Sequence, residues 1–138
     1  MRTALDSSVL LDVIVDAPLW AARSGRALSA AMQEGSLIIG ESVLAEVVPA
    51  LGTELIGEFL ADWQIQFIPS TAESALLAGA MFAKYLERSG QARRVLPDFL
   101  IGAHAFIHAD RLLARDRGYY RDYFDGLTVI EPKAAGSS

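Results

Sequence analysis

The sequence predicts an α/β fold in which a short parallel sheet lies between helices on both faces. Apolar segments of about four or five residues alternate with helical segments along the chain, which is the pattern of βαβ units. Glycine, proline or aspartate ends most of these apolar segments. A chain of 138 residues with 52% hydrophobic residues suits a single domain with a core of its own.

The first half of the chain alternates short strands with amphipathic helices. Strands are expected over residues 2–5, 36–40 and 66–68. Helices are expected over residues 7–16, 19–34, 42–51 and 54–63. Ser7 or Ser8 can cap the first helix, and Gly35 is a suitable stop for the second. Pro49 should kink or shorten the third, because proline removes a backbone donor.

The second half continues the alternation with one long basic connection. Thr71 can cap a helix that runs to about Arg88, and a small-residue helix is expected over 98–109 behind Pro97. Strands are expected over 111–115 and 127–131, with a turn or short helix over 118–124 between them. We therefore expect one domain over 1–132 and a flexible C-terminal tail over 133–138.

Composition excludes several classes of protein. Without cysteine the chain has no disulfide scaffold, no cysteine nucleophile and no thiolate-held metal. The longest segment free of charged residues, 99–109, is too short for a spanning helix of about 20 residues, so we expect no membrane contact and a cytoplasmic protein. The net charge of −5 argues at first against binding of nucleic acid. However, residues 84–121 carry eight basic side chains and four acidic ones, so this part of the chain could face a polyanion.

Four carboxylates occupy positions where α/β proteins place their ligands. Asp6 and Asp116 each follow a strand, so both should lie at the carboxyl edge of the sheet. Asp98 lies at the start of an expected helix. The face of this helix that carries Asp98 otherwise carries only small residues, which either leave room for a ligand or allow close packing. Glu46 lies in an almost wholly apolar helix, where a carboxylate needs solvent or a cation.

Carboxylates that converge need positive charge between them. Two of them about 4 Å apart repel by about 4 kcal/mol at an effective dielectric constant near 20. Ligation by oxygen atoms alone favours Mg²⁺ or Mn²⁺. Such ions can activate water and stabilise the leaving oxygen of a phosphodiester, which makes metal-dependent hydrolysis the expected reaction class.

These motifs resemble PIN-domain ribonucleases, and more narrowly the VapC-type toxins of VapBC type II toxin–antitoxin systems. The resemblance rests on LDSSVLLD at 5–12, SVLAEVV at 42–48, LPDFLIGA at 96–103 and LLARD at 112–116. It implies a PIN-like three-layer α/β/α sandwich with a short central parallel sheet, and Mg²⁺- or Mn²⁺-dependent RNA endonuclease activity. It also implies a homodimer, a cognate antitoxin protein as partner, and Asp6, Glu46, Asp98 and Asp116 as catalytic metal ligands.

Several other residues have two interpretations each. Ser8 either supports Asp6 or caps the helix, and Tyr119, Tyr120 and Tyr123 either stack on unpaired bases or pack the last turn. Candidate contacts to RNA phosphates are Arg93, Arg94, Arg115, Arg117 and Arg121.

Two further groups of residues are more readily explained by packing. His104 and His108 have the spacing of a metal pair, but they point away from Asp98, which favours a structural role. Trp20, Phe59 and Trp63 are expected in the core, although they could line an antitoxin groove or a dimer interface.

A second function class is a non-catalytic signalling module of the receiver type with an acidic Mg²⁺ pocket. Such a module needs a lysine after a late strand. No lysine lies between Lys84 and Lys133, which counts against it.

Overall fold

The computed structural model describes residues 1–89, 95–115 and 118–134. Its five strands form a single parallel sheet in the order β3-β2-β1-β4-β5. The strands are β1 (Arg2–Leu5), β2 (Ser36–Ile39), β3 (Ile65–Phe67), β4 (Arg111–Leu113) and β5 (Val129–Ile130). The expected α/β class and the expected strands are confirmed; β1 has the expected bounds, and the bounds of the other strands differ by one or two residues.

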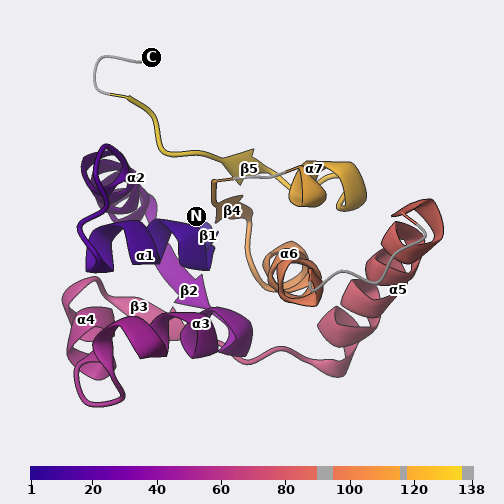
Figure 1. The fold of residues 1–138 in the computed structure, drawn as a ribbon, viewed down its shortest axis with the longest axis horizontal. Helices are drawn as coiled ribbons and strands as arrows, with labels where there is room; N and C mark the ends of the chain where they lie inside the picture. The colour runs from indigo at the N-terminus through magenta and orange to yellow at the C-terminus, as the bar shows by residue number, and fades with distance from the viewer. Residues whose placement is uncertain (90–94, 116–117, 135–138) are drawn as a thin grey trace.

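In the described part of the chain, seven helices cover both faces of the sheet (Figure 1). On one face lie α1 (Ser7–Ile14), α2 (Trp20–Glu34), α3 (Glu41–Leu51) and α4 (Ile56–Asp62). On the other lie α5 (Ala72–Ser89), α6 (Leu96–His108) and α7 (Tyr119–Tyr123). This three-layer α/β/α arrangement is the one the sequence predicts. No helix in the described part of the chain is long and apolar enough to cross a membrane.

The ends of the helices follow local chemistry, with one difference from expectation. Asp6, rather than Ser7 or Ser8, is the N-cap of α1, because its carboxylate accepts from the backbone N–H of Ser8 at 3.2 Å. Thr71 and Ser74 exchange side-chain-to-backbone hydrogen bonds of 3.3 and 2.9 Å at the start of α5, as expected of a capping pair. The helix α3 continues through Pro49 to Leu51.

The apolar interior has two parts. The larger lies between the sheet and its helices and contains fully buried side chains such as Leu10, Leu28 and Leu37. The smaller lies among α5, α6 and α7 and is largely aromatic, with Phe99 in contact with Tyr85, Tyr119, Tyr123 and Phe124. This aromatic cluster fixes the short helix α7 against α6.

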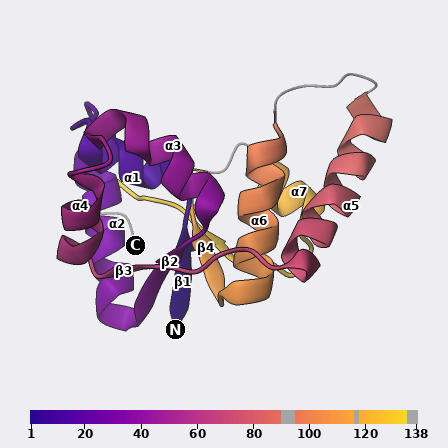
Figure 2. The ribbon, with the colours of Figure 1, turned by 90° about the horizontal axis from the view of Figure 1, so that it is seen from below.

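Two helices meet beyond the carboxyl edge of the sheet. Figure 2 shows the start of α6 beside α3 at the end of the molecule toward which β1 and β2 run. The first turns of α1 and α6 and the middle of α3 therefore surround the same place. A parallel sheet leaves this edge open to ligands, so the functional site is sought here.

Candidate active site

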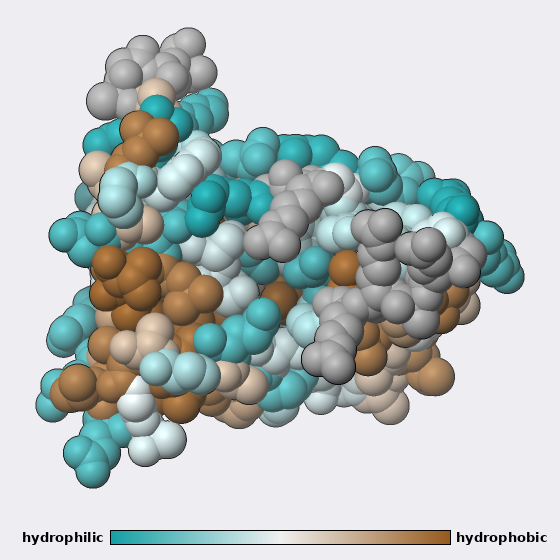
Figure 3. Space-filling model, in the orientation of Figure 1, coloured by the Kyte–Doolittle hydropathy of each residue, from teal (hydrophilic) through white to brown (hydrophobic). Residues whose placement is uncertain are grey.

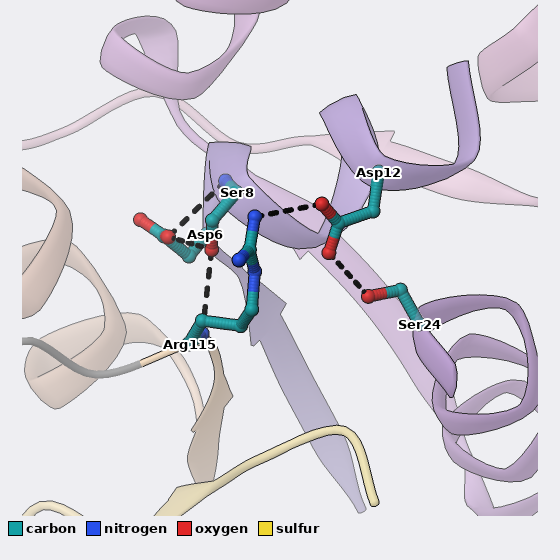
Figure 4. A network of polar contacts seen from close by, with 5 residues as sticks. All are labelled: Asp6, Ser8, Asp12, Ser24 and Arg115. Carbon is teal, nitrogen blue, oxygen red and sulfur yellow. Dashed lines mark hydrogen bonds and ion pairs between the residues drawn. The ribbon is translucent and has the colours of Figure 1, made fainter. Parts of the chain in front are cut away.

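The carboxylate of Asp6 is buried and held on both of its oxygens. The residue is 6% exposed. Its Oδ1 accepts a hydrogen bond of 2.7 Å from the hydroxyl of Tyr120, and its Oδ2 accepts from the N–H and the hydroxyl of Ser8. Figure 4 shows Ser8 beside Asp6 at the end of β1. The position of this carboxylate is therefore set by donors from two elements, α1 and α7.

Glu46 and Asp98 face the same cavity as Asp6. This acidic cavity, as we call it, has a volume of about 310 Å³, and Pro97, Arg115 and Tyr120 also line it. Glu46 projects from α3 and accepts a hydrogen bond of 3.2 Å from the hydroxyl of Ser7. Asp98 lies in the first turn of α6. Three of the four predicted acidic residues thus line one cavity, although 92 residues separate Asp6 from Asp98 in the sequence.

The ionisation of Tyr120 reflects the negative charge around it. Burial raises the pKa of Tyr120 far above its usual value, and the charge and hydrogen bond of Asp6 raise it further. The charges of Asp98 and Glu46 act in the same direction. Tyr120 therefore remains a neutral donor to Asp6, and the three carboxylates lie within electrostatic reach of one hydroxyl.

Four predicted site residues lie outside the described residues: Asp116, Arg93, Arg94 and Arg117. Arg115 is described, and it lines the acidic cavity from the end of β4. Its guanidinium forms an ion pair of 2.7 Å with Asp12 and stacks on the ring of Trp20 at 4.5 Å. The backbone N–H of Arg115 donates to the hydroxyl of Ser8 at 3.3 Å.

Sequence reasoning did not find two of these supporting contacts. Asp12 was part of a motif with no assigned role, yet its buried carboxylate also accepts from the hydroxyl of Ser24 at 2.7 Å and so joins α1, α2 and Arg115 (Figure 4). Tyr120 was considered only for base stacking or packing. The available signal is its phenolic hydroxyl, which needs a hydrogen-bond partner once the ring is buried.

The small residues of α6 allow close packing at Gly102. A Cβ atom there would lie 2.4 Å from the ring of Phe124. Of the two interpretations of the small-residue face, the structure supports close packing at this position, while Asp98 at the start of the helix borders the cavity. Tyr119 and Tyr123 pack in the aromatic cluster, as favoured from the sequence.

The two histidines have a structural role at the other side of α6. His104 is buried and its Nε2 lies 2.7 Å from the carbonyl oxygen of Ile68. Gly40 approaches it so closely that a Cβ atom would lie 2.9 Å from the imidazole. Neither histidine lines the acidic cavity. These contacts give His104 a packing role, and the ring of His108 lies 5.0 Å from that of His104.

The donor set of the acidic cavity suits a hard cation. Its three carboxylates offer oxygen atoms only, which Mg²⁺ and Mn²⁺ prefer. Among the residues that the structure describes, no three acidic or histidine side chains already lie close enough together to hold one ion. A shared ion would therefore require a change of rotamer at Glu46 or Asp98, or the participation of Asp116.

Comparison with known proteins shows the fold. No protein-family model and no curated protein matches the sequence. Solved structures do match. VapBC2 from Rickettsia felis, bound to a DNA fragment from its promoter, has a TM-score of 0.70 and 21% identity, over 95% of this chain and 98% of that chain. VapBC-1 from nontypeable Haemophilus influenzae has a TM-score of 0.67 and 15% identity over the same shares.

A third match extends this likeness. DNA-bound VapBC from Salmonella typhimurium has a TM-score of 0.67 and 16% identity, over 95% of this chain and 98% of that chain. Similarity at these identities concerns the path of the backbone. The five-stranded parallel sheet, its strand order and the two helical layers thus confirm the resemblance that the acidic motifs indicated: this chain has the PIN-like fold found in VapBC toxin–antitoxin complexes.

Proposed function

We propose that this protein is a Mg²⁺- or Mn²⁺-dependent RNA endonuclease and the toxin of a toxin–antitoxin pair. The observation that carries the proposal is the acidic cavity, where Asp6, Glu46 and Asp98 meet from three different elements at the carboxyl edge of the sheet. Asp116, which follows β4 by three residues, is the proposed fourth acidic group. A fold shared with VapBC complexes supports the toxin assignment.

The chain's own residues would prepare the site in three ways. Asp6, Glu46 and Asp98 would hold the cation, which when bound supplies Lewis-acid activation of water and neutralises charge on the phosphodiester. Tyr120 and Ser8 orient the carboxylate of Asp6, and Ser7 orients that of Glu46. Such support of metal ligands typically contributes 10- to 100-fold to affinity or activity, about the effect expected here.

Replacement of single carboxylates tests the nuclease proposal. Asp6→Asn and Asp98→Asn keep the shape of the side chain but remove the charge that would hold the cation. We expect both variants to retain the circular dichroism spectrum of the parent and to lose Mg²⁺-dependent cleavage of single-stranded RNA. Asp62→Asn, on the exposed end of α4, is the matched control and should cleave normally. Full activity of both site variants, with trace metals removed, would contradict the proposal.

An antitoxin and a second copy of the chain are the proposed protein partners, in the cytoplasm. Figure 3 shows apolar side chains gathered over α1, α3 and α4. Val15 and Leu55, at the ends of α1 and α4, are each at least half exposed. Exposed apolar patches often mark contacts with other proteins. A small protein encoded beside this gene should inhibit RNA cleavage when co-expressed, and light scattering of the purified chain will give its oligomeric state.

The receiver-type alternative finds no support in the fold. Receiver domains have the strand order 2-1-3-4-5. In the observed order, β3-β2-β1-β4-β5, β1 lies between β2 and β4, whereas in the receiver order it lies between β2 and β3. Covalent labelling of a single aspartate by an acyl-phosphate donor would be needed to revive that function.

A further inference from the structure

A second and larger cavity adjoins the acidic one. It has a volume of about 700 Å³ and is formed mainly by the start of α2, by α7 and by the segment from β5 to Lys133. Ser8 and Arg115 line both cavities, so the two lie side by side at these residues. We call it the basic cavity. Its volume falls within the range of about 300–1,000 Å³ that is typical of ligand sites.

The sign of the charge reverses between the two cavities. Asp6, Glu46 and Asp98 line the acidic cavity, with Arg115 at its border. Among the residues that the structure describes, the basic cavity is lined by three cationic side chains, Arg115, Arg121 and Lys133, and by the carboxylate of Glu131. An anionic chain that places one phosphate among bound cations in the acidic cavity can therefore place a neighbouring phosphate among side-chain cations.

Arg115 is held in position at the border. Its ion pair with the buried Asp12 and its stacking on Trp20 fix the guanidinium without occupying all five of its N–H donors. Its backbone N–H contacts Ser8, which in turn donates to Asp6. One residue thus connects the orientation of the first carboxylate with the wall of the basic cavity.

Arg121 can exchange its present partner for a phosphate at little cost. Its ion pair with Glu131 is 3.2 Å long, and both side chains are nearly half exposed, 49% and 45%. Exposed pairs of this kind contribute little to stability, because water screens them. A phosphate oxygen offers the same charge with a geometry that suits the guanidinium.

We propose that the basic cavity binds the phosphodiester backbone of the RNA strand beside the phosphate to be cleaved. Arg115, Arg121 and Lys133 would contact phosphate oxygens, and the apolar wall of Val129, Ile130 and Pro132 would face the sugar and base. This assignment rests on the proposed nuclease function. It adds a second binding site on the β5 side of the acidic cavity. Trp20 and Lys133 are part of the lining of this second site.

Binding without cleavage tests the cavity directly. The probe is a labelled single-stranded oligoribonucleotide of about six nucleotides, in EDTA, with its affinity measured by fluorescence anisotropy. The double variant Arg121→Gln/Lys133→Gln should bind about tenfold more weakly. The slope of log affinity against log salt should decrease by about 0.7 for each lost phosphate contact. Lys84→Gln, on the exposed face of α5 across the sheet, is the control and should match the parent.

Trp20 reports where the probe binds. In a Trp63→Phe background it is the single remaining tryptophan, so the probe should change its emission. Equal affinity and salt slope in the double variant, or unchanged Trp20 emission on binding, would overturn the proposal. So would inorganic phosphate binding as tightly as the oligonucleotide, or a glutamate-rich peptide displacing it. Cleavage in Mg²⁺ is assayed separately, so failure of the cavity and failure of the nuclease are distinguishable.

Discussion

The hydroxyl of Tyr120 is the contact on which the geometry of Asp6 most depends. It donates to a buried carboxylate, and hydrogen bonds to charged groups contribute about 1.5–3 kcal/mol, more than neutral ones. The ring of Tyr120 is itself buried and packs with the sheet core. Because the hydroxyl and the ring have separate roles, they can be separated by substitution.

Tyr120→Phe should reduce both stability and metal binding. Removal of the hydroxyl leaves Oδ1 of Asp6 without this donor, so we expect the free energy of unfolding to fall by about 1.5–3 kcal/mol. Mg²⁺ affinity, measured by calorimetry, should fall by about 10- to 100-fold. Tyr123→Phe keeps its ring in the aromatic cluster and serves as the control. An unchanged Mg²⁺ affinity in Tyr120→Phe would show that the hydroxyl stabilises the fold but does not contribute to metal binding.

His104 makes stability depend on pH. Burial lowers the pKa of His104 below its usual value of 6.5, and the charge of His108 lowers it further. The unfolded chain therefore binds a proton on this residue at a higher pH than the folded chain does, so stability is lost as pH falls below about 6.5.

His104→Gln should flatten this dependence. Glutamine retains a side-chain donor for the carbonyl of Ile68 but does not titrate. Chemical denaturation between about pH 5 and 7 should show a smaller loss of unfolding free energy in His104→Gln than in the parent. His108→Gln removes one of the charges that lower the pKa of His104, so it should weaken the dependence only in part. An equally steep profile in His104→Gln would assign the pH dependence to other groups.

At the scale of elements, the contact between α6 and α7 determines where Tyr120 lies. Phe124 packs directly on Gly102, and the aromatic cluster surrounds this contact. The fold thereby uses the smallest residue of α6 to bring α7, and with it the donor to Asp6, close to the sheet.

Gly102→Ala tests this close approach. The new Cβ would lie 2.4 Å from Phe124, which is 3% exposed and has no room to move. Overpacking costs about 1–3 kcal/mol, whereas alanine gains about 1 kcal/mol of helix propensity. We expect a net loss in thermal unfolding, recovered at least in part in Gly102→Ala/Phe124→Leu. Gly79→Ala, where a Cβ meets nothing within 4 Å, should instead be stabilising.

At the scale of the whole molecule, the acidic net charge and the proposed RNA substrate are compatible. Three of the seventeen acidic residues line one cavity, and three basic side chains line its neighbour. The total of −5 therefore does not describe the local charge at either cavity. Binding of a cation in the acidic cavity should consequently be detectable as added stability.

Mg²⁺ should raise the melting temperature of the protein. A ligand at 100 times its Kd adds about 2.7 kcal/mol to the folded state, which corresponds to several degrees in a domain of this size. The shift should be much smaller in Asp6→Asn and unchanged in Asp62→Asn, as measured by scanning calorimetry. Equal shifts in the parent and in Asp6→Asn would place the Mg²⁺ elsewhere on the molecule.

The order of elements and the position of the acids follow from local pattern. Apolar runs ended by Asp6 and Gly40 became β1 and β2, and the expected helices formed with small shifts at their ends. Placement of Asp6 after β1 also predicted its position at the carboxyl edge. These features can be predicted from the sequence because each depends on residues close together in the chain and on the general rules of parallel sheets.

The sequence by itself therefore determined the α/β class, the order of the strands and helices along the chain, and the carboxylates to examine. Only the tertiary structure decided how those carboxylates are supported. The bond from Tyr120 to Asp6 joins residues 114 positions apart, and that from Arg115 to Asp12 joins residues 103 apart. Such contacts produce no periodic pattern in the sequence, because they depend on how distant elements pack and not on the local conformation of either residue.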